Sequence, residues 1–536
     1  MATIVFISAL QKHLAFQDDL LRRLRGKTLV ERSIEKARNL GIRDSSIHVY
    51  TDSEQIALQA ERTGVQAFLN VNLLDLSVGE SSNFIEYCCD SVTEGDQILR
   101  LSPYAPLLES STLDKAAAVL EQANVDAVCG LRTVRQSLYM DCGRTVESIF
   151  LSEDGQILDI ESSAFTLLKA GAIKKLSNKT LKVQPVEVSE DAFEINSYLD
   201  WWVCEKLLAR KRIVFRVIGG DRVGMGHIYR ALTVAHEITD HEVLMVTDTS
   251  NEVALNKLMD YGYRLEVYER SKIVEEIIGL SPNMVVNDIL DTNADDIRAY
   301  KQKGIKVVNF EDLGEGAKLS DLTFNELYDQ QQFAGNNIYW GKDYFFVRDE
   351  FAEATPCVFR ENLDAILLVF GGIDQHDLSQ KILLQVLGLC RARNIHIYVV
   401  TGPGYTGYHG LRKKVDRMDD VTLTHATGVI SRIMEKVSLA ITSNGRTVYE
   451  MAHMNIPAIV IPQHDREKTH DFACEENGFV ALEPYKKGVT EQVVLEQLTR
   501  ILDDQDYRRF LYDNTQKFLF HKNKTGVLKL IIDLLN

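Results

Sequence analysis

Short apolar runs alternate with helix-like segments along most of this chain, and no other feature restricts its fold as strongly. Such an alternation is typical of parallel sheets whose faces are covered by helices. Strands are predicted at residues 3–8, 46–50, 97–101, 127–131, 213–218, 242–247, 284–286, 306–310, 365–370, 396–401, 439–442 and 458–461, and helices at residues 29–40, 112–122, 229–238, 379–391 and 447–453. The sequence therefore predicts an α/β fold that binds ligands outside the carboxyl ends of its strands.

The length of 536 residues exceeds one domain. An amphipathic helix at residues 198–209 ends in the basic run Arg210-Lys211-Arg212, and a new strand follows at once, so a first domain is predicted at residues 1–211. A second boundary between Gly341 and Asn362 divides the remainder into two half-size α/β domains, at residues 212–350 and 351–536.

Composition excludes several classes of partner. The formal net charge of −17 opposes binding to nucleic acid or to anionic membranes, which require a basic surface. No apolar run approaches the ~20 residues of a membrane span, and the apolar start lacks a basic leader. The eight cysteines lack metal-type spacing, which is typical of buried thiols in a reducing compartment. We expect a cytoplasmic protein with no nucleic-acid partner and no membrane span.

A glycine-rich loop connects a predicted strand to a predicted helix at residues 215–230, which read FRVIGGDRVGMGHIYR. Glycines allow a ligand to approach the backbone, and a helix start offers unpaired N–H donors and a positive dipole end to an anion. His227 brings a titratable ring to the same place. The spacing fits neither the dinucleotide fingerprint nor the P-loop. The loop is suited to a sugar nucleotide.

Two later segments repeat this pattern of strand, glycine turn and helix start. Residues 367–374 end in Gly371-Gly372, and residues 440–450 contain Asn444, Gly445, Arg446, Thr447 and Glu450. Paired glycines after a buried strand suit backbone donation to a phosphate. Residues 455–467 add a strand that leads into a polar loop. Together these segments predict a site for a nucleoside diphosphate.

The whole segment from residue 212 to residue 536 resembles the UDP-sugar hydrolase of pseudaminic acid biosynthesis and its spore-coat polysaccharide relatives. These proteins share a two-lobed GT-B fold of two Rossmann-like domains with the peptidoglycan N-acetylglucosaminyltransferase. The matching residues are Arg216, Gly226-His227, Arg230, 287–292, 309–314, 325–328, 341–344, 348–351, 371–374 and 445–447 with Glu450. One departure is Glu467-Lys468, where the peptidoglycan enzyme has glutamines.

The resemblance implies that His227 is the general base and that Glu450 binds the nucleotide ribose, with no metal required. A histidine titrates near neutral pH, so it can take a proton from the oxygen that attacks the anomeric carbon, with inversion. Three functions remain open: a UDP-amino-sugar hydrolase of nonulosonic-acid or surface-glycan biosynthesis, a glycosyltransferase with the same site, or a noncatalytic scaffold. The expected substrate-binding residues are Arg216, Asp221, Gly226, Asp288, Gly371, Gly372, Asn444, Gly445, Arg446, Thr447 and Glu450. Asp288 and Asp291 alone could merely cap structure.

Residues 1–211 resemble the cytidylyltransferases that activate sialic-acid-like sugars, through residues 24–29, 49–57, 100–107 and 194–201. The resemblance implies a nucleotidyltransferase-like Rossmannoid domain. Its expected triphosphate loop, at residues 7–19, contains no glycine and includes Asp18 and Asp19. Tyr104 stands where a metal-binding aspartate is expected, and the late acidic pair has become Glu194 and Asn196. Such a site is poor for Mg²⁺, which prefers carboxylates.

We therefore expect this domain to have kept its fold and lost, or much altered, its transferase chemistry. Contact with a partner, formation of a homodimer, or binding of CTP or a CMP-sugar are the roles left to it. The alternative is an active Mg²⁺-dependent transferase in which Lys12, His13 or Arg22 replaces the usual cations. The protein would then be bifunctional.

Overall fold

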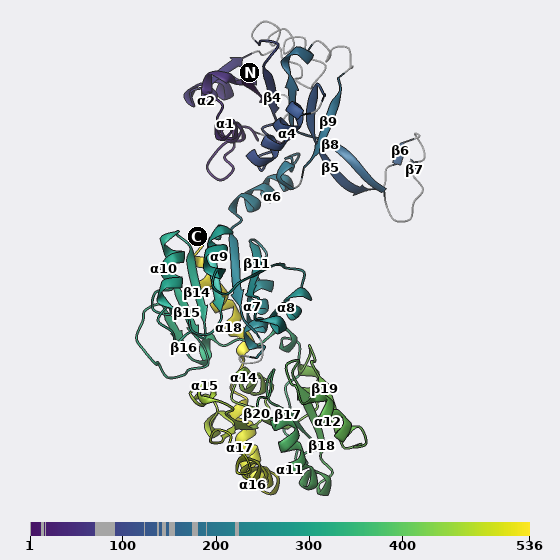
Figure 1. The fold of residues 1–536 in the computed structure, drawn as a ribbon, viewed down its shortest axis with the longest axis vertical. Helices are drawn as coiled ribbons and strands as arrows, with labels where there is room; N and C mark the ends of the chain where they lie inside the picture. Colours follow the sequence, from purple (N-terminus) through teal and green to yellow (C-terminus); the bar gives the residue numbers. More distant parts are fainter. Residues whose placement is uncertain are drawn as a thin grey trace. The chain divides into compact units, whose positions relative to one another are not determined.

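The computed structural model describes residues 2–11, 15–16, 18–69, 92–122, 124–136, 139–141, 146–148, 156–173, 181–188, 190–219 and 224–535. The chain divides into two compact units, Met1–Arg210 and Lys211–Asn536 (Figure 1). Within the described residues, three large sheets contain mainly parallel strand pairs and pack against helices. The predicted α/β class is thereby confirmed.

The first unit is built on a seven-stranded sheet in the order β3-β2-β1-β4-β8-β5-β9, in which β8 runs antiparallel to β4 and β5. Helix α1 begins after Thr28 because the Thr28 hydroxyl accepts the N–H of Glu31 while the Glu31 carboxylate accepts the N–H of Thr28. The strands are β1 (Thr3–Ser8), β2 (Ile47–Thr51), β3 (Gln66–Leu69), β4 (Gln97–Leu101), β5 (Ala127–Gln136), β8 (Gln156–Lys169) and β9 (Val183–Glu187), with a separate pair of β6 (Tyr139–Asp141) and β7 (Val146–Ser148). The helices are α1 (Leu29–Asn39), α2 (Glu54–Arg62), α4 (Ser110–Gln122) and α6 (Tyr198–Ala209).

The second unit begins with a seven-stranded parallel sheet in the order β12-β11-β10-β13-β14-β15-β16. We call this sheet and the helices that cover it the first lobe. Helices α7, α8 and α18 cover one face of this sheet, and α9 and α10 cover the other. The strands are β10 (Arg212–Val217), β11 (Glu242–Asp248), β12 (Arg264–Tyr268), β13 (Met284–Asp288), β14 (Lys306–Phe310), β15 (Leu322–Asn325) and β16 (Ile338–Trp340). The helices are α7 (Gly226–His236), α8 (Glu252–Met259), α9 (Ile273–Gly279), α10 (Ala294–Gln302) and α18 (Asn523–Asp533).

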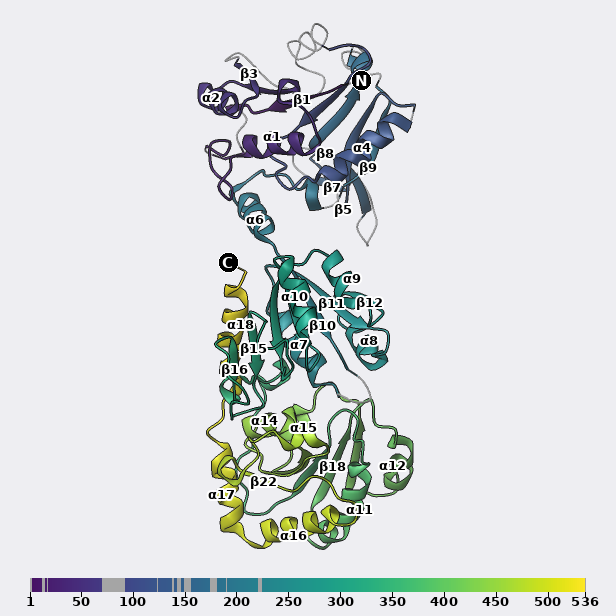
Figure 2. The same cartoon turned by 60° about the vertical axis from the view of Figure 1, so that its left-hand side comes forward.

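A six-stranded parallel sheet in the order β19-β18-β17-β20-β21-β22 forms the second lobe. Its strands are β17 (Ala365–Val369), β18 (His396–Thr401), β19 (Val421–His425), β20 (Leu439–Ser443), β21 (Ala458–Ile461) and β22 (Phe479–Ala481). Its helices are α11 (Leu378–Ala392), α12 (Tyr408–Val415), α13 (Ser431–Met434), α14 (Arg446–His453), α15 (Asp465–Lys468), α16 (Thr490–Asp503) and α17 (Gln505–Thr515). The last helix of the chain, α18, returns to the first lobe, where Val527 and Ile531 are buried (Figure 2).

The two lobes share an apolar core. One buried cluster contains Leu327, which follows β15, and Phe345 and Phe351, which follow β16. The same cluster contains Val448 and Met451 of α14 in the second lobe. This packing holds the carboxyl ends of the two sheets toward a common space. No described helix combines the length and the apolar character needed to cross a bilayer.

Candidate functional site

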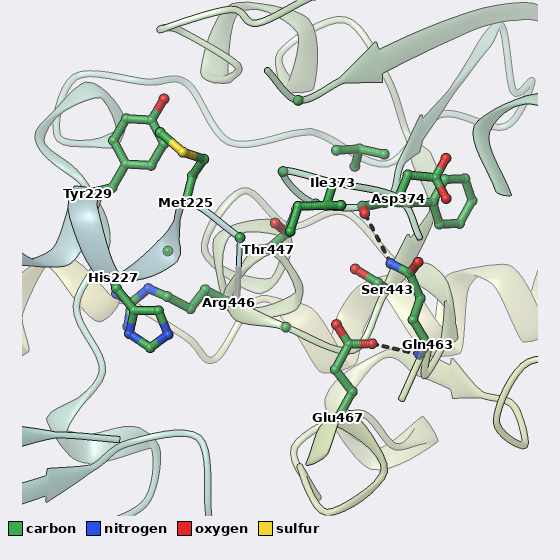
Figure 3. A pocket seen from close by; sticks show the side chains of 18 of the residues that line it. Met225, His227, Tyr229, Ile373, Asp374, Ser443, Arg446, Thr447, Gln463 and Glu467 are labelled. Carbon is green, nitrogen blue, oxygen red and sulfur yellow. Dashed lines mark hydrogen bonds between the residues drawn. The ribbon is translucent and has the colours of Figure 1, made fainter. Parts of the chain in front are cut away.

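A cavity of about 260 Å³ lies between the two lobes of the second unit. The first lobe contributes the loop before α7 and the residues that follow β13 and β14, and the second lobe contributes the turns after β17, β18, β20 and β21. Figure 3 shows His227 of the first lobe on one side, and Asp374, Thr447 and Glu467 of the second lobe. Parallel sheets of both lobes therefore direct their carboxyl ends at the cavity, as expected for an open α/β fold.

Glycines allow the lobes to approach each other closely beside this cavity. A Cβ atom on Gly372 would lie 3.1 Å from Cγ of Met225, and one on Gly226 would lie 3.1 Å from Cδ of Arg446. Gly371 has a φ of +75°, which favours glycine. Helix α7 starts after Met225 and α14 after Gly445, and neither start has a side-chain cap. Both helix starts therefore offer backbone N–H donors and a positive dipole end to the cavity.

His227 lies in the first turn of α7, lines the cavity and is 4% exposed. Its Nδ1 lies 2.6 Å from Oδ1 of Asp288, the last residue of β13. Nδ1 also lies 3.1 Å from Nη2 of Arg230, which can only donate, but its contact with the carboxylate, which can only accept, is the shorter of the two. We therefore assign the proton to Nδ1, which leaves a free lone pair on Nε2. None of the described residues makes a hydrogen bond to Nε2. The ring is thus oriented to accept a proton from a molecule in the cavity.

Asp288 is held as a carboxylate by Arg230, which is 1% exposed. Nε of Arg230 donates to Oδ2 of Asp288 at 2.8 Å, and Nη2 donates to Oδ1. Burial raises the pKa of Asp288, but Arg230 and His227 outweigh burial and leave it lowered. Arg230 Nη1 also lies 3.3 Å from Glu311 and donates to Glu326. The pKa of Glu311 falls to about 2, because His227 and Arg230 outweigh the effect of burial.

Glu450, in the first turn of α14, lines the cavity from the second lobe. Its Oε1 accepts a hydrogen bond from Nε of Arg348 at 2.8 Å. Burial lowers the pKa of Arg348, but Glu450 and Glu350 outweigh it and leave the pKa raised. Thr447 and Gly445 also line the cavity. The carboxylate of Glu450 is therefore fixed in place at the second-lobe side.

Several of the predicted site residues lie elsewhere. Arg216 does not line the cavity, and its Nη1 donates to Asp296 of α10 at 2.9 Å. Nδ2 of Asn444 donates to the backbone oxygens of Glu467 and His470, at 2.8 and 2.9 Å, so it holds the loop after β21. Asp221 lies outside the described residues. Arg446 does line the cavity, but its guanidinium donates to Glu326 and to the backbone oxygen of Phe346 on the first-lobe side.

Sequence reasoning did not single out His470, and it assigned no role to Glu311 or Arg466, although all three line the cavity. Nδ1 of His470 lies 2.7 Å from the backbone oxygen of Asn444, and its buried Nε2 has no partner among the described residues. Nothing in the residue pattern distinguishes His470 from an ordinary loop histidine. The segment 309–314 contained Glu311, but its role depends on residues distant in sequence.

Glu467 had been noted only as a departure from the glutamines of the peptidoglycan enzyme. Its Oε2 accepts the N–H of Gln463 at 2.7 Å. Burial raises the pKa of this carboxyl to about 7. The cavity therefore contains a carboxyl group that ionises near neutral pH on the second-lobe side.

In the first unit, the backbone donors of the expected triphosphate loop contact carboxylates of the chain itself. The N–H of Gln11 donates to Asp52 at 2.6 Å, and the N–H of Ala15 donates to Asp19 at 2.6 Å. Tyr104 also donates its hydroxyl to Asp19, at 3.2 Å. Asp19 is fully buried, and burial raises its pKa although these hydrogen bonds oppose the change. Among the described residues of this loop, the N–H groups of Gln11 and Ala15 are therefore already occupied by carboxylates of the chain.

Other residues expected to take part in transferase chemistry also contact neighbouring groups of the chain. Glu194 accepts a hydrogen bond from Ser162 at 2.9 Å, and Nδ2 of Asn196 donates to the backbone oxygen of Glu194. Arg22 lies over the ring of Tyr198, whereas Lys12 and His13 lie outside the described residues. Among the described residues, no group of three or more His, Cys, Asp or Glu side chains is arranged to hold a metal ion.

No family model matches the chain. Over 291 residues it is 25% identical to the uncharacterized protein MJ1062 of Methanocaldococcus jannaschii, covering 50% of this chain and 60% of that protein. Over 328 residues it is 21% identical to the spore coat polysaccharide biosynthesis protein SpsG of Bacillus subtilis, covering 59% of this chain and 96% of that protein. The resemblance to spore-coat polysaccharide proteins is thus confirmed, while the link to pseudaminic acid rests on the motifs alone.

Several solved structures match parts of the chain at low similarity. MurG of Acinetobacter baumannii is 13% identical, with a TM-score of 0.43 over 60% of this chain and 99% of that chain. The Anabaena protein HepE, in complex with UDP and glucose, is 12% identical, with a TM-score of 0.41 over 61% and 99%. A CMP:2-keto-3-deoxy-manno-octonic acid synthetase in complex with CTP is 11% identical, with a TM-score of 0.31 over 39% and 99%. These TM-scores are too low to support an argument about the ligand of this chain.

Proposed function

We propose that the second unit is an enzyme that cleaves a nucleotide sugar at its anomeric C–O bond. The preferred substrate in this proposal is a UDP-amino sugar. The observation that carries this proposal is the pair of His227 and Asp288 at the edge of a cavity lined by glycine turns and two uncapped helix starts. A ring nitrogen with a fixed tautomer supplies the base, and the turns supply donors for a diphosphate.

In this mechanism Nε2 of His227 accepts a proton from the oxygen that attacks the anomeric carbon. The positive charge that develops on the ring is stabilised by the Asp288 carboxylate, which Arg230 holds in place. The bond between the anomeric carbon and the diphosphate oxygen breaks as the new C–O bond forms on the opposite face, so the anomeric configuration inverts. The backbone donors of the turns stabilise the charge on the departing diphosphate.

The nucleotide end of the substrate is assigned to the second lobe. Gly371, Gly372 and the start of α14 offer N–H groups to the diphosphate, and Glu450 offers a fixed carboxylate to the ribose hydroxyls. Such hydrogen bonds to a charged acceptor contribute roughly 1.5–3 kcal/mol each. The identification of the nucleotide as UDP rests on the resemblance to the hydrolase and transferase families.

Hydrolysis and transfer differ only in whether water or an acceptor hydroxyl attacks, and His227 acts alike in both. The test is incubation of the full chain with a panel of UDP- and CMP-sugars, with and without EDTA. Mass spectrometry then distinguishes free sugar from a glycosylated acceptor. His227→Gln is expected to lower nucleotide release by ~10²–10⁴. His236→Gln is the matched control, since His236 lies on the same helix and contacts Asp349 outside the cavity.

Loss of nucleotide release in both histidine variants, or in neither, would contradict the role of His227. If no member of the panel releases nucleotide while UDP still binds, the scaffold alternative gains support. For the first unit we propose that the transferase chemistry is lost, which the occupied donors of its loop support.

A further inference from the structure

Arg446 lies at the start of α14 in the second lobe, and its guanidinium reaches two hydrogen-bond acceptors of the first lobe, one after β15 and one after β16. Its Nη1 donates to Oε1 of Glu326 at 2.5 Å, and its Nη2 donates to the backbone oxygen of Phe346 at 3.0 Å. Its guanidinium carbon lies 4.4 Å from the centroid of the Phe345 ring. A planar guanidinium that donates to two acceptors and stacks on a ring is held in one orientation, which a lysine could not reproduce.

The same carboxylate oxygen of Glu326 also accepts a hydrogen bond from Arg230. Glu326 directly follows β15 and is 1% exposed. Arg230 in turn holds both oxygens of Asp288, which orients His227. A continuous series of charged hydrogen bonds therefore leads from the second-lobe turn to the ring in the first lobe.

Arg230 is shared among Asp288, Glu326 and Glu311, so the balance between these carboxylates sets where it lies. Arg446 supplies Glu326 with a second positive partner. Among the described residues, no other cation forms an ion pair with Glu326. Without Arg446, Glu326 would depend on Arg230 alone and would compete more strongly with Asp288 for it. Buried charges that lose a partner are costly, so this competition has to be resolved by movement.

We propose that Arg446 is a positioning residue, which sets the orientation of His227 through Glu326, Arg230 and Asp288 when the two lobes are closed. The position of the second lobe thereby affects the orientation of His227, the proposed general base, in the first lobe. This inference rests on the proposed function in so far as it treats His227 as the base. It differs from the expectation that Arg446 binds the substrate directly.

The test compares two partly buried arginines of the same cavity in the full-length protein, whose side chains are 13% (Arg446) and 16% (Arg348) exposed. Arg446→Met is expected to leave the affinity for UDP, measured by calorimetry, within about threefold, and to lower the rate constant of nucleotide release by about tenfold or more. Arg348→Met is the matched control, because Arg348 holds Glu450 on the nucleotide side. It is expected to weaken UDP binding by about tenfold or more.

A second measurement does not depend on turnover. The ¹⁵N resonances of His227, assigned with His227→Gln, give the pH midpoint of its ring titration. Loss of the Arg446 charge and a weaker hold of Arg230 on Asp288 both favour the protonated ring. Arg446→Met is therefore expected to raise this midpoint by about 0.5 pH unit or more, and Glu326→Gln to lower it. Arg348→Met is expected to move it by less than half as much.

Breaking a buried ion pair can prevent folding, so the double variant Arg446→Gln, Glu326→Gln is measured as well, because it removes both charges together. The proposal is overturned if Arg446→Met loses UDP affinity by more than tenfold with an unchanged His227 midpoint. In the double variant the two changes shift the midpoint in opposite directions, so there a loss of UDP affinity by more than tenfold is by itself the contradicting result. Direct diphosphate binding would then be the role of Arg446. If the midpoint shifts as expected but His227→Gln retains activity, the positioning role stands and the proposed function fails.

Discussion

His227 depends on the carboxylate of Asp288, and the side-chain amide of asparagine could not take its place. Asn at position 288 would keep the shape of Asp288, but its amide could donate to Nδ1 and favour the wrong ring tautomer. Asp288→Asn is therefore expected to lower the rate of nucleotide release by about 10²–10⁴ and to leave UDP affinity nearly unchanged.

Asp296→Asn serves as the matched control for this change. Asp296 also accepts a hydrogen bond from a partly buried arginine, Arg216, but neither residue lines the cavity. Steady-state rates and calorimetric UDP titrations of the two variants give the comparison. Equal losses in both variants would show that the effect arises from general disturbance of the first lobe.

The raised pKa of Glu467 leads us to expect that the stability of the folded protein depends on pH. Its pKa of about 7 lies above the ordinary value of 4.5, so the folded state favours the neutral carboxyl. The stability that this preference contributes is fully present below about pH 4.5 and is lost as pH rises through about 7. At 1.36 kcal/mol per unit, the shift from 4.5 to about 7 corresponds to at most about 3 kcal/mol.

The measurement is the thermal unfolding midpoint of the second unit within the full chain, for wild type and Glu467→Gln, between about pH 5 and about pH 8. The wild-type midpoint is expected to fall relative to that of the variant over this interval. Parallel curves for the two proteins would contradict a neutral Glu467 in the folded state.

At the scale of elements, the glycine turns matter because they bring the two lobes together. A Cβ on Gly372 would lie 3.2 Å from the backbone nitrogen of Met225, and there is no flexible side chain whose movement relieves that contact. Gly372→Ala should therefore push the lobes apart by a few tenths of an ångström. Overpacking of this kind costs about 1–3 kcal/mol, which calorimetry should detect as weaker UDP binding.

Gly388→Ala provides the contrast within the same lobe. Gly388 lies inside α11, and a Cβ there would meet no atom within 4 Å. Alanine is favoured over glycine in a helix interior, so this variant should gain roughly 0.5–1 kcal/mol of stability and bind UDP as wild type does. Unchanged UDP affinity in Gly372→Ala would mean that the cavity tolerates a wider separation of the lobes.

Elements with strong local patterns could be predicted from the sequence. Strands β14, β18 and β21 begin and end at the predicted residues. Helix α7 instead begins at Gly226, three residues before its predicted start, because the loop glycine itself adopts the first helical position. Strand β8 was not predicted, since its antiparallel pairing with β4 and β5 depends on residues far along the chain.

The residues of the candidate site could be predicted from the sequence only where they belong to a recognisable motif. His227, Glu450 and the glycine turns all line the cavity, as the strand, turn and helix pattern indicated. The partners of Arg216 and Arg446 could not be derived, because each guanidinium contacts a carboxylate 80 or more residues distant in sequence. The position of His470 could not be derived either, because its Nδ1 contacts the backbone oxygen of Asn444, 26 residues away in sequence, and no motif links the two residues.

At the scale of the whole molecule, the first unit raises the question of a second activity. Asp52 and Asp19 accept the N–H groups of Gln11 and Ala15 in the described part of the expected triphosphate loop. Tyr104 stands where a metal ligand is expected and donates to Asp19. Without a held metal, charge on leaving pyrophosphate is poorly neutralised. The full chain is therefore expected to release no pyrophosphate from CTP with nonulosonic acids at a rate useful to a pathway, even with ample Mg²⁺.

This assay is best done in the His227→Gln background, so that any cleavage of nucleotides by the second unit does not contribute. Pyrophosphate is measured with and without EDTA. Robust Mg²⁺-dependent release that disappears in Glu194→Ala would show that the first unit is a divergent but working transferase, and the protein would be bifunctional.

The return of α18 to the first lobe means that the first lobe does not correspond to one uninterrupted stretch of sequence. A gene fragment ending near residue 350 would lack the helix whose Val527 and Ile531 complete the buried face of the first sheet. Such a fragment would expose an apolar strip and tend to aggregate. The chain also crosses between the lobes twice, so any hinge motion must bend both crossings together. Fragments for crystallography or for tethered fusions should therefore keep residues 212–535 as one piece.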